Sequence, residues 1–247
     1  MKILFSPSEA KYDGGDNTPI QKTDYLFPEL FDKRLEIITQ YKNYIVQASN
    51  DALSVLFGTK KQTVIDYYKT DIFQKKTMKT VERYDGVAYD YLAYGTLNDT
   101  QKSYIDNNVI IFSNLFGPLL AGDEGLPDYK LKQGAKINNT AVERFYKEHF
   151  TPKLNDFLSQ EPYLDLRAGF YNKFYKPTSP HTTLKFIKDG KVVSHWAKAY
   201  RGIVLRQLAL HQIETIEEFM AMEIENLSVK EICSQGHNTQ IIYDITV

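Results

Sequence analysis

Two cations three residues apart, Lys198 and Arg201, are the side chains best suited to bind an anion in this sequence. They fall at the start of a predicted helix over residues 198–213. Its apolar face, at helical spacing, consists of Ile203, Val204, Leu205, Leu208 and Leu210. Free backbone N–H groups at a helix start, together with a Lys and an Arg, can form an anion site. Solvated cations on an exposed face explain the same spacing.

The segments before this helix predict the strands that position it. Residues 182–187 and 191–195 are predicted as two short strands, joined by a tight turn at Asp189-Gly190. Trp196 directly follows them and is able to stack on a nucleic-acid base, although a core or sheet-edge aromatic explains it equally. Another buried strand is predicted over residues 2–6, and the polar loop after it carries Lys11.

The rest of the chain mixes helical and extended patterns without regular strand-helix-strand alternation. Helices are predicted over residues 29–48, 50–57, 59–73, 140–150, 152–159 and 215–222, and further strands over 109–113, 163–166 and 240–247. In the longest of these helices, Leu35 is expected on or near the apolar face. Asn50 is the expected N-cap of the second helix and Gly58 its stop. The sequence therefore predicts an α+β fold, a mixed β-sheet surrounded by helices, in one domain over residues 1–247.

Composition limits the classes of function. The chain has 247 residues, 43% hydrophobic and 25% charged, with a formal net charge of −1. Nucleic-acid binders are often strongly basic, so any phosphate binding here requires a local patch of cations. No membrane segment or signal peptide is expected, and a single cysteine, Cys233, fits a reducing cytoplasm. We therefore expect a cytoplasmic protein.

Motifs for nucleotide, metal or nucleophilic chemistry are lacking in the sequence. It has no phosphate-loop or dinucleotide fingerprint and no nucleophile elbow, and its five histidines have no paired ligand spacing. Catalytic residues therefore stay unassigned, and we expect no cofactor and no metal site. Cys233 is a candidate peroxide-reactive thiol if its pKa is low, or else an idle cysteine. The acidic side chains, Asp13, Asp16, Asp85, Asp90 and Asp123, are expected to be solvated or salt-bridged.

Four stretches, taken in order, resemble the YaaA family of bacterial peroxide stress proteins. They are Ser6-Pro-Ser-Glu-Ala-Lys11, Tyr84-Asp-Gly-Val-Ala-Tyr-Asp-Tyr-Leu92, Ile111-Phe-Ser-Asn-Leu-Phe-Gly117 with its continuation to Gly134, and Lys198-Ala-Tyr-Arg-Gly202. The resemblance implies a mixed-sheet fold with a positively charged cleft and a helix-hairpin-helix element. It also implies DNA binding and a role in limiting intracellular iron and oxidative DNA damage.

Basic residues at the family's positions are the candidate DNA contacts. Lys11, Lys198 and Arg201 match these positions, and Arg206 follows in the same predicted helix. We hypothesise that they line one cleft and contact phosphates. The alternative is that Lys11 caps a loop while Arg201 pairs with a carboxylate such as Asp85.

The candidate helix-hairpin-helix spans residues 50–68, with its hairpin at 56–61. Such a hairpin directs backbone N–H groups at a DNA phosphate, and Lys60 and Lys61 would add charge. Lys60 stands where the usual hairpin has a second glycine. An ordinary connection between two helices explains the same residues.

The prediction from sequence is thus a peroxide stress protein that binds DNA through phosphates, without reading sequence. No helix presents Asn, Gln and Arg in a base-reading arrangement. One alternative is an enzyme acting on a nucleic acid or another phosphate-containing anion in the same cleft. A second is a structural or partner-binding protein with no nucleic-acid contact.

Overall fold

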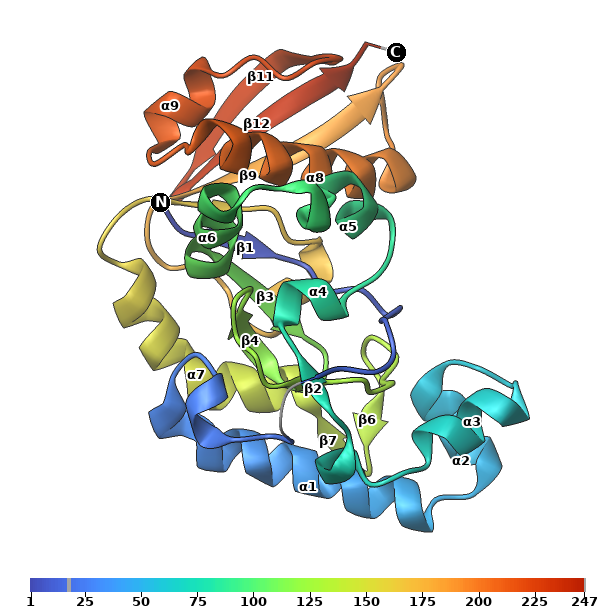
Figure 1. The fold of residues 1–247 in the computed structure, drawn as a ribbon. Helices are drawn as coiled ribbons and strands as arrows, with labels where there is room; N and C mark the ends of the chain where they lie inside the picture. Colours follow the sequence, from blue (N-terminus) through green and yellow to red (C-terminus); the bar gives the residue numbers. More distant parts are fainter. Residues whose placement is uncertain (17–18, 247) are drawn as a thin grey trace.

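A mixed, mainly parallel sheet forms the centre of the protein (Figure 1). The computed structural model describes residues 1–16 and 19–246, leaving aside the side chains of residues 194 and 195. The strand order is β11-β12-β9-β8-β1-β3-β4, and β10 also pairs with β9. The strands are β1 (Ile3–Phe5), β3 (Val109–Ser113), β4 (Gly117–Leu120), β8 (Tyr163–Asp165), β9 (His181–Lys188), β10 (Lys191–Val192), β11 (Leu227–Gln235) and β12 (Asn238–Ile245).

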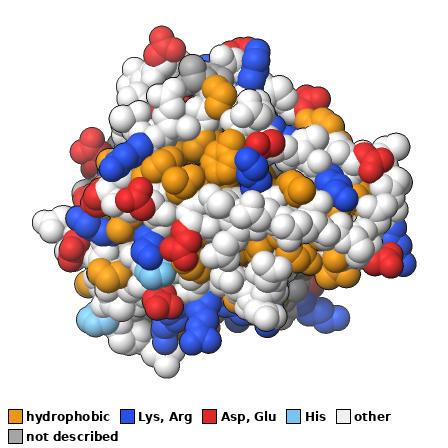
Figure 2. All heavy atoms as spheres, turned by 90° about the horizontal axis from the view of Figure 1, so that it is seen from below, with side chains coloured by type: hydrophobic (Ala, Val, Ile, Leu, Met, Phe, Trp, Pro, Cys, Tyr) orange, Lys and Arg blue, Asp and Glu red, His pale blue; other side chains and the backbone are white. Residues whose placement is uncertain are grey.

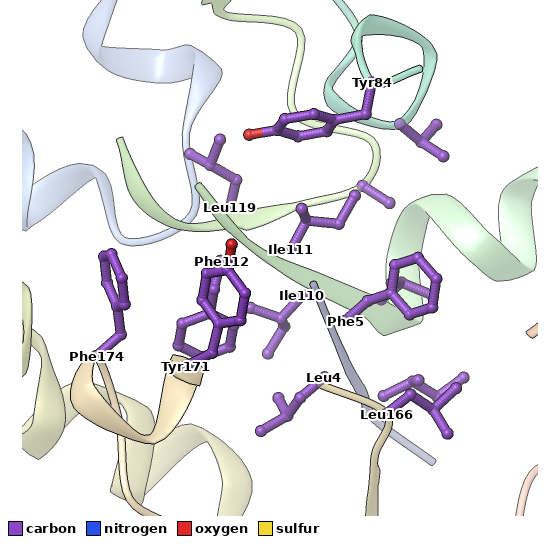
Figure 3. Close-up of a cluster of buried hydrophobic side chains, with 14 of the residues drawn as sticks. Leu4, Phe5, Tyr84, Ile110, Ile111, Phe112, Leu119, Leu166, Tyr171 and Phe174 are labelled. Atoms are coloured by element: carbon purple, nitrogen blue, oxygen red, sulfur yellow. The ribbon is translucent and has the colours of Figure 1, made fainter. Parts of the chain in front are cut away.

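The strands from β12 to β3 run parallel, and β11 and β4 pair antiparallel with them at the edges. Every residue of β1 and β3 is buried, which is typical of strands covered on both faces. Figure 3 shows Leu4 and Phe5 of β1 packed among Ile110, Ile111 and Phe112 of β3. The strands predicted over 2–6, 109–113 and 163–166 are therefore confirmed, with small differences at their ends.

Outside the central sheet, the described residues also form two short strand pairs and several short 3-10 helices. The pairs are β2 (Thr77–Met78) with β5 (Leu126–Pro127) and β6 (Lys136–Ile137) with β7 (Thr140–Ala141). The 3-10 turns are η1 (Lys22–Asp24), η2 (Pro28–Leu30), η3 (Ile72–Gln74), η4 (Tyr94–Thr96) and η5 (Gly169–Lys173).

Helices account for most of the remaining chain. They are α1 (Phe31–Gln47), α2 (Asn50–Phe57), α3 (Gln62–Tyr68), α4 (Thr80–Arg83), α5 (Val87–Leu92), α6 (Asp99–Asn108), α7 (Val142–Leu158), α8 (Ser194–His211) and α9 (Ile216–Ala221). The structure thus confirms a mixed sheet packed with helices. Within the described residues, no helix combines the length and the apolar character needed to cross a bilayer.

The long helices correct two predictions. In α1 the expected inward residue Leu35 is 37% exposed, while the guanidinium of Arg34 is fully buried and bonded to backbone carbonyls. The predicted break before Pro152 is also wrong, because α7 continues through it. The buried residues Tyr146, Phe150 and Leu154 form a stripe that crosses the proline, and this packing holds the helix together.

Helix α8 begins four residues earlier than the predicted helix over 198–213, and this changes the surroundings of Lys198 and Arg201. The helix begins at Ser194, and β10 ends at Val192, whereas a strand was predicted to reach residue 195. Lys198 and Arg201 therefore lie inside α8, one to two turns from its start. Their backbone N–H groups take part in the helix, so an anion site built on free N–H groups at these residues is wrong.

The connection between α2 and α3 occupies residues 58–61. Ser49, not the expected Asn50, caps α2 by accepting a hydrogen bond from the Ala52 N–H, and Asn50 instead donates to the Gln62 side chain. Gly58 ends α2 with a φ of 66°, as predicted. Helix α3 is shorter than the predicted 59–73. This pair of helices projects at the end of the molecule far from α8 (Figure 1).

The face that α1 crosses does not carry a field of one sign. Viewed from below, Lys and Arg side chains lie among Asp, Glu and apolar side chains over most of this face, and several Lys and Arg side chains gather along its lower edge (Figure 2).

Candidate functional site

A pocket of about 450 Å³ opens where the chain leaves β1. The chain later adds β3 on one side of β1 and β8 on the other, so β1 lies at a switch point of the parallel sheet. Crevices outside the carboxyl ends of strands at such points are the usual ligand sites of α/β sheets. The lining residues are Phe5, Ser6, Pro7, Ser8, Glu9, Gly86, Val87, Ala88, Tyr89, Gln133, Ala168, Tyr171, Lys198 and Arg201.

Hydrogen bonds between distant segments fix the floor of this pocket. The Ala168 N–H donates to Ser6 Oγ at 2.8 Å, which joins the loop after β8 to the loop after β1. The Tyr89 hydroxyl donates to the Ser6 carbonyl at 2.9 Å, and the Gln133 N–H donates to Glu9 Oε1 at 3.0 Å. The loop after β1 is therefore held from several sides, as a preformed site requires.

Close approach of α5 and α8 forms another wall. A Cβ atom on Gly202 would lie 2.1 Å from the Ala88 carbonyl oxygen, so only glycine permits this crossing. Gly86 precedes α5 with a φ of 123°, and a Cβ there would lie 2.8 Å from Ser8 Oγ. These contacts bring Lys198 and Arg201 of α8 to the pocket.

Replacement of Gly202 by alanine is expected to push α8 away from α5. Overpacking of this kind costs roughly 1–3 kcal/mol of unfolding free energy. Urea unfolding followed by circular dichroism measures the loss. Gly95→Ala is the control, because a Cβ there meets nothing within 4 Å. An equal effect of both substitutions would contradict the close helix crossing.

Arg201 is the cation best placed to receive an anion. It lines the pocket half-buried, and among the described residues it makes no hydrogen bond or ion pair, so the alternative pairing with Asp85 is not formed. Burial lowers the pKa of Arg201, and the charge of Asp165 opposes this shift. Lys198, one turn earlier, lines the same pocket and is exposed.

Lys11 lies beside the pocket loop but is not among the lining residues. Its Nζ is 3.4 Å from the carbonyl oxygens of Ser8 and Glu9 and 4.1 Å from the centre of the Tyr129 ring. Burial lowers the pKa of Lys11 to about 7. The charge of Lys11 is therefore sensitive to pH near neutrality.

The remaining predicted DNA contacts lie away from this pocket. Arg206 donates through Nη1 to the Leu92 carbonyl and Thr96 Oγ1, both at 2.9 Å, and so ties α8 to the end of α5. Lys60 and Lys61 are exposed in the connection between α2 and α3. The structure therefore brings Lys198 and Arg201 together in one pocket, holds Lys11 against the loop after β1 outside the lining, and places Arg206, Lys60 and Lys61 away from this pocket.

Trp196 also lies outside the pocket. It is 37% exposed, and the Lys188 ammonium lies 5.2 Å from the centre of its ring. It is therefore not a core aromatic.

Buried polar side chains near the pocket were missed in the sequence. Asp165, at the end of β8, pairs with Arg167 through two short bonds, Nε to Oδ1 at 2.8 Å and Nη2 to Oδ2 at 2.7 Å. Both residues are 7% exposed. Asp165 is the last residue of β8 and Arg167 follows two residues later, and polar residues at the end of a buried strand are the signal that would have identified this pair.

Asp123 and Cys233, two further candidates for chemistry, both take part in hydrogen bonds within the protein. Asp123 is mostly buried and accepts hydrogen bonds from the N–H groups of Leu26 and Leu120, and burial raises its pKa to about 6. The exposed Cys233 donates to a carboxylate oxygen of Glu231, which raises the pKa of the thiol. That is opposite to the low pKa expected of a peroxide-reactive thiol. Among the described residues, no group of three or more His, Cys, Asp and Glu side chains is arranged to hold a metal ion.

Comparison with known proteins adds to this geometry. A family model described as peroxide stress protein YaaA matches residues 1–232. An uncharacterised protein of Campylobacter jejuni is 47% identical over 245 residues, which cover 99% of each chain. A UPF0246 protein of Corynebacterium efficiens is 36% identical over 216 residues, covering 85% of each chain. The resemblance inferred from the sequence is thereby confirmed, and the chain belongs to the YaaA family of peroxide stress proteins.

Proposed function

We propose that this protein binds DNA during peroxide stress and thereby helps to limit oxidative DNA damage and intracellular iron. The observation that carries the DNA-binding part is Arg201, a half-buried guanidinium without a protein partner among the described residues, beside Lys198 in one pocket. An arginine in this state favours a phosphate, which accepts several of its N–H groups at once. The family description supports the link to peroxide stress.

Under this proposal the basic cleft consists of Lys198, Arg201 and Lys11, the last of which is held by the loop after β1. Phosphates dominate such binding, which then depends steeply on salt and little on base sequence. The connection between α2 and α3 would act as the helix-hairpin-helix, with Lys60 and Lys61 holding a phosphate farther along the strand. Because this element and α8 lie at different ends of the molecule (Figure 1), they would contact separate stretches of DNA.

The double substitution Lys198→Gln/Arg201→Gln is expected to weaken duplex binding and to flatten its salt dependence. The slope of log K against log salt should decrease by about two units, one for each lost phosphate contact. Fluorescence anisotropy at several salt concentrations measures this slope. The matched control is Arg144→Gln/Lys147→Gln, because these exposed cations have the same spacing on α7. Equal slopes for the two double variants would refute the assignment.

Lys60→Glu/Lys61→Glu tests the second element in the same assay. Reversed charge at a phosphate contact is expected to lower the affinity for DNA. Unchanged affinity would remove the connection between α2 and α3 from the interface and leave the α8 pocket as the DNA contact.

An enzyme acting on a phosphate-containing anion is the second candidate function. It is favoured by the size of the site, a partly open pocket of about 450 Å³ that is smaller than a groove as wide as a duplex, and by Lys11 on the loop beside it. An amine whose pKa is about 7 is suited to accept a proton at neutral pH. Turnover of nucleotides or DNA that is lost in Lys11→Met while anion binding persists would establish this function instead.

A further inference from the structure

A second pocket, of about 420 Å³, lies on the face of the sheet that is turned away from α8. Phe186 of β9 stacks on Tyr200 of α8, with ring centroids 5.7 Å apart. Because side chains alternate between the two faces along a strand, His181 and Thr183 point away from α8. The strand register places Asn238 of β12 opposite His181, and these side chains line the pocket. Among the described residues, it shares no lining residue with the pocket beside α8.

Hydrogen-bond acceptors in this second pocket are already used within the protein. Among the described lining residues, Asp165 carries the only carboxylate, and both of its oxygens accept from the Arg167 guanidinium, at 2.8 and 2.7 Å. The side-chain oxygen of Asn238 accepts from the Thr183 hydroxyl at 2.9 Å. The charge of Asp165 is therefore offset, and the NH₂ group of Asn238 is left as a donor.

The cationic and imidazole groups of the pocket are donors or become donors on protonation. The Nδ1 atom of His181 lies 2.8 Å from the Ser179 carbonyl oxygen. Since a carbonyl oxygen only accepts, Nδ1 carries the proton, which fixes the ring and leaves Nε2 for a ligand. Lys176, on the segment after η5, is exposed and forms no ion pair within the described part of the chain. His237, also exposed, adds a second imidazole.

We propose that this pocket binds a small molecule by its phosphate or carboxylate group, held between the Lys176 ammonium and the protonated ring of His181. The NH₂ group of Asn238 supplies a neutral donor in the same pocket. The oxygens of an ionised phosphate or carboxylate accept hydrogen bonds, so they match a pocket whose own acceptors are used. The volume of about 420 Å³ lies within the range of roughly 300–1,000 Å³ typical of small-ligand sites. This site is independent of the proposed DNA contact.

Proton uptake by His181 is part of this binding. In the neutral ring Nε2 presents a lone pair, which repels an anion, whereas in the protonated ring it donates to one. The titratable and charged groups around His181 are Tyr163 and Asp165 of β8, Arg167, Lys176 and His237. Tyr163 stacks on the His181 ring, and Asp165 is paired with Arg167. An anion beside Lys176 therefore stabilises a second cation there, and binding is expected to tighten as the pH falls.

The ring signal of His181 in nuclear magnetic resonance spectra tests the proposal directly, and its loss in His181→Gln assigns it. Sulfate stands in for a phosphate and acetate for a carboxylate, because neither changes charge over the pH range of a histidine titration. Chloride at equal ionic strength controls for general screening. One charge-assisted hydrogen bond favours the protonated ring about tenfold, so a bound anion should raise the midpoint of the His181 titration by about one pH unit. A midpoint unchanged by both anions would overturn the proposal.

Lys176→Gln provides the variant test, with Lys173→Gln as its matched control. Both lysines are exposed on the same segment, but Lys173 lies over the Phe170 ring, 4.9 Å from its centre, and does not line the pocket. Loss of Lys176 is expected to weaken binding of the anion about threefold, the effect of an exposed charge, while the control keeps the native affinity. Equal losses in the two variants would mean that the anion responds to overall charge, and the proposal would be wrong. Circular dichroism verifies that both variants fold.

Further arms identify the group that binds and its source. If sulfate raises the midpoint more than acetate does, the pocket takes a phosphate group, and the reverse order assigns a carboxylate. A single-stranded oligonucleotide that shifts the His181 signal where neither small anion does would assign the pocket to DNA and overturn the small-molecule proposal.

The variant Lys198→Gln/Arg201→Gln separates this proposal from the proposed function. The response of the His181 signal to the anion is expected to be unchanged in this variant. Loss of the response would show that the anion acts from the pocket beside α8, and the second site would be refuted. If no duplex binds to the native protein while the anion still shifts the His181 signal, DNA binding alone fails and the second site stands.

Discussion

Replacement of Arg34 by methionine is expected to lower the free energy of unfolding by about 3–5 kcal/mol. The Arg34 guanidinium donates to the carbonyls of Leu26 at 2.5 Å and Pro118 at 2.7 Å, and also to the Phe116 carbonyl. Methionine fills much of the same space but donates nothing, so these buried acceptors would lose their donors.

The packing around Arg34 adds to this cost. Its guanidinium carbon lies 4.7 Å from the centre of the Phe150 ring, and it joins α1 to α7 and to the turn before β4. Urea unfolding measures the loss, and Arg144→Met on the exposed part of α7 is the control. If the Arg34→Met protein is as stable as the native one, the expectation is wrong. The desolvation penalty of burying the guanidinium would then be as large as the stabilisation from its hydrogen bonds.

Replacement of Asp165 by asparagine is expected to produce the second large effect. Removing one partner of a buried ion pair leaves the other charge buried and uncompensated, at a cost of about 3–5 kcal/mol. Arg167 would keep its bonds to the Tyr171 and Tyr175 carbonyls, both at 3.2 Å, but would lose the carboxylate. The loop that carries Ala168 and Tyr171 would loosen, and with it one side of the pocket.

Denaturant unfolding and duplex binding together test this second expectation. The control is Glu29→Gln, because the pair of Glu29 with Lys153 has a similarly short distance, 2.8 Å against 2.7 Å, but about half of each side chain is exposed. Exposed pairs contribute little, so this variant should unfold almost as the native protein does. If both variants lose a similar free energy of unfolding, the contribution of these ion pairs does not depend on their burial, and the expectation is wrong.

Local features of the fold were largely predictable from sequence. The buried strands over 109–113 and 163–166 and the stop at Gly58 follow from short-range rules, because apolar runs and glycine act within a few residues. Errors occurred where packing overrode these rules. Helix α7 continues through Pro152 because buried side chains on both sides of the proline stabilise the longer helix, and α8 begins at Ser194, before Lys198.

The candidate site could be predicted only in part. The sequence by itself determined which residues carry charge, and it placed Lys198 and Arg201 on one helical face by their spacing. It also determined family membership, since four ordered stretches suffice for that. The tertiary structure alone decided that Ser6 and Ala168, 162 residues apart, join by a hydrogen bond at the floor of a pocket. It alone turned Arg206 toward the end of α5 and left Arg201 open to a ligand. Contacts between segments so far apart depend on the order of strands in the sheet, and no short stretch of sequence encodes that order.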